Sequence, residues 1–145
     1  KENIKLIIVA SLGKAFGVNG GVIAGDLEFI NQIKKDTLFV SSAGMSPSFL
    51  DTFLKGHEIY QSQLKKLRDN CNYIYAKLKH LKPIKIEKNY PVFFYEDEKI
   101  TDYLYKKKII ITSFHYPSSE KKINRIVLNA NHTKEQLDTL IREIN

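Results

Sequence analysis

The 145-residue sequence holds a single cysteine, Cys71, and only three arginines among its 23 basic residues. One cysteine excludes an intrachain disulfide bond and a cysteine-rich metal site. The formal net charge of +7 would suit an anionic partner, but most of it comes from lysines spread over expected helix faces. Because specific nucleic-acid surfaces usually favour arginine, we expect no nucleic-acid partner.

Long apolar runs are also missing, since none approaches the ~18 residues that a membrane span needs. No signal peptide is visible, so we expect a soluble, cytoplasmic protein without a membrane partner. The four histidines are scattered and no His-Glu-x-x-His motif occurs, so we expect no metal site.

The most informative stretch is Ser11-Leu12-Gly13-Lys14-Ala15-Phe16-Gly17, which follows the apolar run 6–10. That run is short and rich in β-branched residues, which predicts a buried strand. A buried strand needs neighbours on both sides, so we expect a further N-terminal portion of the protein. Lys14 would lie just past the strand end, between glycines that let the backbone bend.

The small and apolar neighbours of Lys14 would remove it from water, which favours the uncharged amine that reacts with an aldehyde. Ser11, three residues earlier, could offer its hydroxyl to a phosphate. A strand-to-loop turn with an exposed lysine explains the same spacing equally well. Other glycine-loop motifs are excluded: Ala15 stands where a Walker A loop has Ser or Thr, and the glycine spacing does not fit a dinucleotide fingerprint.

The rest of the first part predicts mainly helices. We expect a short strand over 21–25 and a helix over 27–35 that is capped by Asp26. Ser46 and Pro47 predict the start of a long helix that runs to about residue 81, with a bend or break at Gly56. Its buried stripe comprises Leu64, Leu67, Cys71, Ile74, Leu78 and Leu81. Pro83 forbids continuation, so we place a boundary between residues 1–82 and 83–145.

The second part predicts the order β, β, α, β, β, α of a small α+β domain. The expected strands are 84–87, 91–95, 109–112 and 125–129, with a helix over 100–107 and a polar loop over 117–119. Thr133 and Gln136 form a capping box for the last helix, 134–144.

The segment from Ser11 to Gly21 resembles the lysine motif of fold-type I pyridoxal-phosphate (PLP) enzymes. It is most similar to that of the α-oxoamine synthases, and among them to the 8-amino-7-oxononanoate synthase family. The resemblance covers nearly the whole chain but only the C-terminal part of such an enzyme. It implies an α/β fold: the end of the large PLP-binding domain with a connecting helix over 1–82, and the small C-terminal α+β domain over 83–145.

The resemblance also implies roles for single residues. Lys14 matches the lysine that holds PLP and moves protons at the substrate α-carbon, and Ser11 matches the residue that binds the cofactor phosphate. The segment 41–47 resembles a stretch that reaches the partner subunit's site, where Ser42, or else Ser41, would bind the phosphate. Arg125 matches the arginine that binds the carboxylate of the amino-acid substrate.

Each role has a simpler alternative. The two serines could merely precede a helix start, and Arg125 could be an edge arginine paired with a surface acid. His115 lies where relatives line the acyl-chain entrance, but a surface-loop histidine is the better interpretation. His132 is expected to order the turn before the last helix.

The implied reaction condenses L-alanine with an acyl-CoA such as pimeloyl-CoA, releasing coenzyme A and carbon dioxide, in biotin biosynthesis. The implied assembly is a homodimer with the active site at the interface. The groups that hold the PLP ring lie upstream of the lysine in this family, so we expect this chain to be inactive alone. Alternatives are another α-oxoamine synthase, a class I/II aminotransferase, or a non-enzymatic basic binding module.

Overall fold

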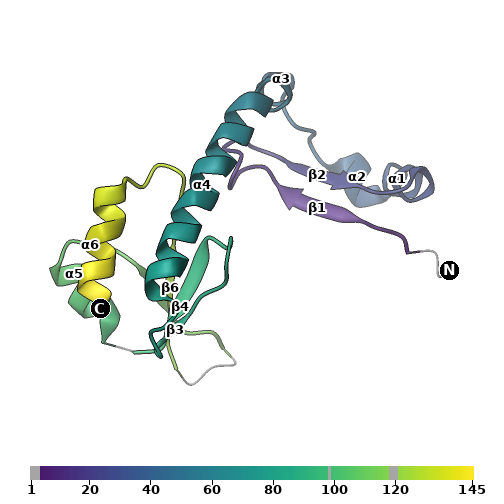
Figure 1. Cartoon of the computed structure of the whole chain (residues 1–145). Helices are drawn as coiled ribbons and strands as arrows, with labels where there is room; N and C mark the ends of the chain where they lie inside the picture. The colour runs from purple at the N-terminus through teal and green to yellow at the C-terminus, as the bar shows by residue number, and fades with distance from the viewer. Residues whose placement is uncertain (1–3, 98, 118–120) are drawn as a thin grey trace. The chain divides into compact units, whose positions relative to one another are not determined.

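The computed structural model describes residues 4–97, 99–117 and 121–145 of the chain (Figure 1). The chain divides into two compact units, Lys1–Tyr60 and Gln61–Asn145, and each unit is described by itself. In the part that the structure describes, no helix has the length and apolar character to cross a membrane. The predicted polar loop falls largely on residues 118–120, outside the described residues.

The first unit begins with a hairpin of two antiparallel strands, β1 (Ile8–Ser11) and β2 (Gly21–Ala24). Their register pairs Ile8 with Ala24 and Ser11 with Gly21, so the lysine segment forms the connecting loop. Both predicted strands are therefore present. The expectation that the first is buried is wrong for the described chain: Ile8 is 50% and Val9 73% exposed, because β2 is the only strand there that pairs with β1.

Three short helices follow the hairpin: α1 (Leu27–Ile33), α2 (Thr37–Ser41) and α3 (Pro47–Lys55). Asp26 caps α1 as predicted, because its carboxylate accepts a hydrogen bond from the Phe29 amide at 2.8 Å. Ser46 occupies the N-cap position of α3, but its hydroxyl contacts that of Ser48 at 2.9 Å instead of capping the helix. Gly56 ends α3, so the predicted long helix is two helices.

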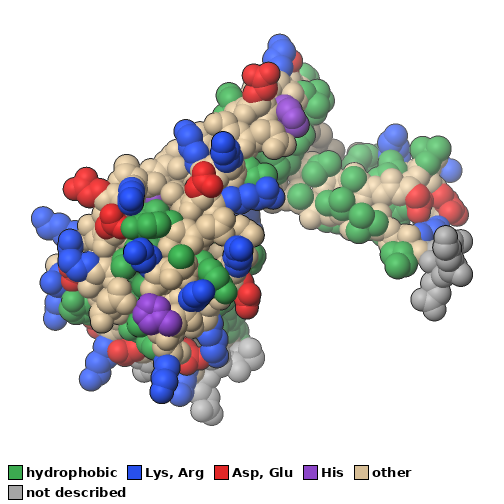
Figure 2. Space-filling model, in the orientation of Figure 1, with side chains coloured by type: hydrophobic (Ala, Val, Ile, Leu, Met, Phe, Trp, Pro, Cys, Tyr) green, Lys and Arg blue, Asp and Glu red, His purple; other side chains and the backbone are tan. Residues whose placement is uncertain are grey.

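The first unit leaves much of its apolar surface uncovered. Figure 2 shows hydrophobic side chains over the hairpin and the helices that follow it. The large exposed ones include Leu6, Val9, Leu27, Leu38, Val40 and Leu54. Contiguous apolar surface of this extent is unusual for a domain that is complete by itself.

The second unit holds a four-stranded antiparallel sheet in the order β3-β4-β6-β5. Its strands are β3 (Ile84–Lys85), β4 (Val92–Tyr95), β5 (Thr112–Phe114) and β6 (Ile123–Val127). Its helices are α4 (His57–Leu78, of which the part from Gln61 belongs here), α5 (Ile100–Lys106) and α6 (Lys134–Ile144). The predicted order β, β, α, β, β, α is confirmed.

These elements enclose one apolar core. The buried core residues are Cys71, Ile74, Leu78, Ile84, Phe93, Ile100, Leu104, Ile126, Leu128, Leu137, Leu140 and Ile144. Cys71 lies in the core as predicted, on the inner face of α4. Because the C-terminal half of α4 packs here, the compact units divide at Tyr60, whereas the sequence predicted a boundary near Pro83. The domain division of the whole protein stays a prediction.

Two strands of the second unit begin two or more residues away from their predicted starts. Lys108 adopts a left-handed conformation with φ 62°, and the Ile109 amide donates to the Leu104 carbonyl at 2.9 Å. These features terminate α5 before residues 109–111. The pairing of β5 with β6 therefore starts only at Thr112. β6 begins two residues early, at Ile123, and includes Asn124, a buried residue whose amide donates to the carbonyls of Tyr95 and Asp97.

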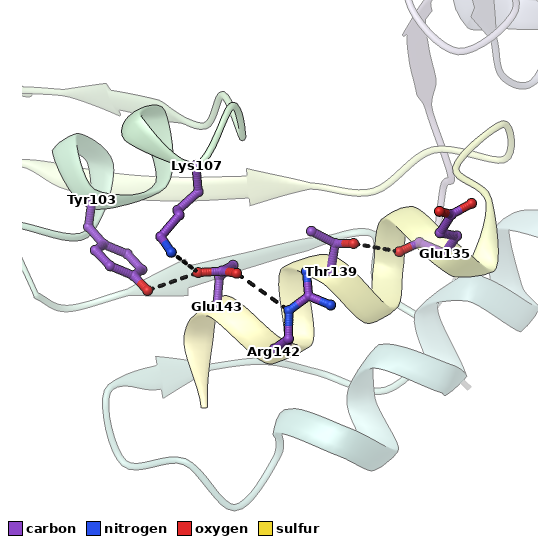
Figure 3. A network of polar contacts seen from close by, with 6 residues as sticks. All are labelled: Tyr103, Lys107, Glu135, Thr139, Arg142 and Glu143. Atoms are coloured by element: carbon purple, nitrogen blue, oxygen red, sulfur yellow. Dashed lines mark hydrogen bonds and ion pairs between the residues drawn. The ribbon is translucent and has the colours of Figure 1, made fainter.

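Helix α6 is fixed to α5 by a polar network around Glu143, whose side chain is 13% exposed (Figure 3). The Tyr103 hydroxyl donates to the Glu143 carboxylate at 2.9 Å, and Lys107 Nζ lies 3.2 Å from it. Arg142 Nε is 3.5 Å from the other carboxylate oxygen. The hydrogen bond from Tyr103, followed by that from Lys107, lowers the pKa of Glu143 below its usual value of 4.5.

We predict that this network makes stability depend on pH. A carboxyl group whose pKa is lower in the folded state stabilises the fold above its unfolded pKa, and this contribution disappears as pH falls through the folded pKa. Urea unfolding should show the wild-type chain to be more stable than Glu143→Gln at pH 7, with the difference shrinking below pH 4.5. Glu87→Gln is the control, because Glu87 is exposed and its side chain has no partner among the described residues. A difference that persists at low pH would contradict the assignment.

Candidate functional site

The loop between β1 and β2 is held shut by backbone hydrogen bonds. The Leu12 amide donates to the Gly20 carbonyl at 2.9 Å, and the Val18 amide donates to the Leu12 carbonyl at 3.0 Å. The side chains of Leu12 and Val18 are 2% and 4% exposed, so they anchor the two ends of the loop. Lys14 lies between these anchors, where the Gly17 amide donates to its carbonyl at 3.2 Å.

The side chain of Lys14 is exposed, as are its neighbours Gly13 and Ala15. The expectation that small neighbours remove Lys14 from water is therefore not met within the described chain, because the loop turns Leu12 and Val18 inward instead. No hydrogen bond or ion pair involves Lys14 Nζ among the described residues. No ion pair within the described chain therefore has to be broken before a ligand reaches the side chain of Lys14.

Two glycines give the loop its path. Gly17 has φ 64° and Gly20 has φ 134°, conformations that residues with a Cβ rarely adopt. At Gly20 a Cβ would also collide with the side chain of Met45, from the segment between α2 and α3. Gly20 thus allows the segment that carries the serines of interest to approach the end of the lysine loop.

Three aromatic rings support the lysine loop from α3 and the start of α4. The Phe16 ring meets Phe53 at 5.3 Å and Tyr60 at 5.0 Å between ring centroids, both edge to face. The Tyr60 hydroxyl also donates to the Phe16 carbonyl at 3.4 Å. Gly56 makes room for Tyr60, since a Cβ there would lie 2.7 Å from the tyrosine ring. We call Phe16, Phe53 and Tyr60 the aromatic cluster.

The predicted phosphate-binding serines have different surroundings. Ser11 ends β1, and its hydroxyl has no hydrogen-bond partner among the described residues. Ser42 follows α2, and its hydroxyl donates to the Phe39 carbonyl at 2.8 Å, while that of Ser41 donates to Thr37 at 2.6 Å. Both hydroxyls thus donate to backbone carbonyls of α2, although their oxygens can still accept hydrogen bonds.

Ser42 lines a hollow of about 820 Å³ in the first unit. Glycines 20, 21 and 44 form part of its wall, and Val9, Ile23 and Phe39 contribute apolar side chains. Val9 of β1, the start of β2 and the Ser42 segment thus line one concave surface. Ser11 and Lys14 are not among its lining residues, so the hollow brings Ser42 close to the hairpin but not to the lysine.

Arg125 lies in β6, between β4 and β5, where its Cα pairs with Phe94 on one side and Thr112 on the other. Its guanidinium carbon is 5.2 Å from the centroid of the Phe114 ring. Its Nε is buried without a hydrogen-bond partner, and none of the ion pairs among the described residues includes it. The alternative of an edge arginine paired with a surface acid is therefore wrong for the described chain.

His132 orders the turn before α6, as predicted. Its Nδ1 accepts a hydrogen bond from the Asn129 amide at 3.2 Å, and the Asn70 side chain donates to the carbonyls of Asn129 and His132. The predicted capping box between Thr133 and Gln136 is also present. His115 is exposed, which agrees with its interpretation as a surface histidine.

The supporting residues were missed by sequence reasoning. Phe53 and Tyr60 were interpreted only as parts of a helix, and Gly56 only as a bend or break in it. Phe114 was noted only as part of the region that resembles the acyl-chain entrance. The available signal was the glycine four residues before Tyr60, because residues at this spacing lie on one helix face.

Comparison with known proteins places the chain in a family. The family model for aminotransferase class I and II matches residues 1–144, so the chain belongs to this family. More specifically, it is 34% identical over 149 residues to 8-amino-7-oxononanoate synthase of Petrotoga mobilis, covering 91% of this chain and 37% of the relative. It is 25% identical to serine palmitoyltransferase 2 of Dictyostelium discoideum, over 96% of this chain and 32% of the relative. The chain thus spans little more than a third of the curated relatives it matches.

Solved structures agree on the fold. An 8-amino-7-oxononanoate synthase from Francisella tularensis superposes with a TM-score of 0.65 at 25% identity, covering 96% of this chain and 44% of that structure. Serine palmitoyltransferase from Sphingomonas wittichii gives a TM-score of 0.75 at 16% identity, over 94% and 38%. The predicted fold class, the C-terminal part of a fold-type I transferase, is confirmed.

We predict that Gly56→Ala loosens the lysine loop. The added methyl group would displace the Tyr60 ring from Phe16, although alanine alone favours the helix by about 1 kcal/mol. Hydrogen exchange of the Leu12 and Val18 amides, which close the loop, should become faster. Gly44→Ala is the matched control, because a Cβ there meets nothing within 4 Å. Equal exchange rates in the two variants would contradict the role of the aromatic cluster.

Proposed function

We propose that this chain is the C-terminal part of a PLP-dependent acyltransferase that condenses an amino acid with an acyl-CoA and releases carbon dioxide. The observation that carries the proposal is Lys14, a lysine without an ion-pair partner among the described residues, on a glycine-shaped loop in a chain that matches the aminotransferase class I and II family over nearly its full length. The resemblance to 8-amino-7-oxononanoate synthases favours L-alanine and pimeloyl-CoA as substrates, in biotin biosynthesis.

Two features of Ser11 and Lys14 support the fit of the cofactor. A primary amine without a partner stands three residues after a serine hydroxyl that is also without one, which suits a group with an aldehyde and a phosphate. When bound, PLP withdraws electrons from the α-carbon of an amino acid. Lys14 would hold the cofactor covalently and, once released by the substrate, would carry the proton of the α-carbon.

Ser11 would donate its free hydroxyl to the cofactor phosphate. Ser42 would bind the phosphate of the neighbouring subunit in a homodimer, with Ser41 as the alternative. To donate, the Ser42 hydroxyl would have to turn away from the Phe39 carbonyl, which it now contacts at 2.8 Å. This cost makes Ser42 a weaker donor than Ser11.

Arg125 would bind the carboxylate of the amino-acid substrate. A guanidinium is always charged and can grip a carboxylate with two parallel hydrogen bonds. Its central place in the sheet fixes its backbone on both sides, and the absence of a paired acid among the described residues leaves its charge available. Holding the carboxylate would orient the amino acid for bond breaking at the α-carbon.

The location in the cytoplasm, like the homodimer, stays a prediction. The similarity to serine palmitoyltransferase makes another α-oxoamine synthase the second candidate function. A class I/II aminotransferase is the third, since the family includes it by description.

The covalent role of Lys14 is tested by borohydride reduction of the full-length protein reconstituted with PLP. We expect a reduced pyridoxyl group on Lys14 in peptide mapping, and none in Lys14→Ala. Lys35→Ala, which removes another exposed lysine of the first unit, is the control and should retain the label. Labelling spread over many lysines, unchanged in Lys14→Ala, would favour a non-enzymatic basic module.

The reaction is tested by measuring coenzyme A release from acyl-CoA thioesters with alanine, glycine or serine as the second substrate. We expect thiol release to depend on the amino acid and to be fastest with L-alanine and pimeloyl-CoA. Preference for serine and a long-chain acyl-CoA would favour the second candidate. Amino transfer to a keto acid without thiol release would overturn the acyltransferase proposal.

A further inference from the structure

We propose that Phe114 is a positioning residue that fixes the guanidinium of Arg125 for a substrate carboxylate. The inference rests on the proposed role of Arg125 and adds the residue that orients its guanidinium. It follows from three observations in the second unit. The Phe114 ring lies beneath the Arg125 guanidinium, the Tyr116 ring packs against the Phe114 ring, and Arg125 Nε is buried without a hydrogen-bond partner.

The guanidinium of Arg125 lies over the ring of Phe114. Phe114 belongs to β5 and Arg125 to the adjacent β6, and the Arg125 guanidinium carbon lies 5.2 Å from the ring centroid. A cation over an aromatic face is attracted by the negative potential of the ring. This attraction restrains the guanidinium, whose N–H groups remain the donors that a carboxylate would use.

A second ring holds the first. Tyr116 meets Phe114 edge to face, with centroids 5.0 Å apart and planes at 74°. Phe114 is itself half-buried at the end of β5. The ring beneath Arg125 therefore has a defined orientation, which a flexible aliphatic side chain would not provide.

The guanidinium is kept in place at a cost. Its Nε is buried and has no hydrogen-bond partner, although burial of an unpaired polar atom is unfavourable. An arginine retained for structure alone would be expected to pair with a carbonyl or an acid, as Arg142 does with Glu143. The unmatched charge of Arg125, held by a ring, suits an anionic ligand that arrives from outside.

The test is a double-mutant cycle in the full-length protein loaded with PLP, with dissociation constants measured by calorimetry. The ligands are L-alanine and L-alanine amide, which lacks the carboxylate. We expect Phe114→Leu to weaken L-alanine binding about fivefold and Arg125→Lys to weaken it at least tenfold. The double variant should bind like Arg125→Lys alone, because the ring acts through the guanidinium. Binding of the amide should change less than twofold throughout.

Two further variants separate positioning from stability. Phe114→Tyr keeps the ring and should restore L-alanine binding, and it remains informative if Phe114→Leu does not fold. Phe94→Leu makes the same chemical change in the strand on the other side of Arg125 and should leave binding unchanged. If Arg125→Lys weakens L-alanine binding but Phe114→Leu does not, or if the two changes are additive, the positioning role is overturned. If Arg125→Lys leaves binding unchanged, the proposed carboxylate role of Arg125 fails as well.

Discussion

The backbone hydrogen bonds of Leu12 are the constraint on which the candidate site depends. Its amide donates to the Gly20 carbonyl and its carbonyl accepts from the Val18 amide, so the nine-residue connection between β1 and β2 becomes a closed loop with Lys14 at its exposed side. A lysine on an open connection would sample many positions, and ordering it on a ligand would cost conformational entropy. Because the loop is closed, part of this entropy is already lost before a ligand binds. The aromatic cluster further restrains the loop at Phe16.

The two units are stabilised in different ways. The second encloses an apolar core between its sheet and helices α4 and α6, with Asn124 satisfied inside it. The first has backbone pairing and capped helices but few buried side chains, and its apolar strand residues face outward. Hydrogen bonds alone contribute little net free energy, so the first unit lacks the main driving force for folding. Its lysine loop is therefore well defined locally, whereas its outer apolar surface is exposed.

Sequence reasoning predicted what depends on local chemistry. The Asp26 cap, the Thr133–Gln136 box and the break at Gly56 each follow from one residue type at one position. It failed where the backbone conformation at a single residue, or the direction in which a loop turns its side chains, decides the structure. The run 109–111 has strand composition, yet the left-handed Lys108 ends α5 there and delays the ladder to Thr112. Likewise the exposure of Lys14 depends on which side chains the loop turns inward, which composition does not specify.

Lys14 and Arg125 both lack a carboxylate partner among the described residues, a property that they share with other basic residues such as Lys35. Lys5, Lys55 and Lys107 each face a carboxylate within 4 Å, and such pairs on the surface add little stability. Neither Lys14 nor Arg125 has such a partner among the described residues, although acidic residues are available in both units. A cation without an internal counterion keeps its full interaction for a ligand, since no pair must be broken first.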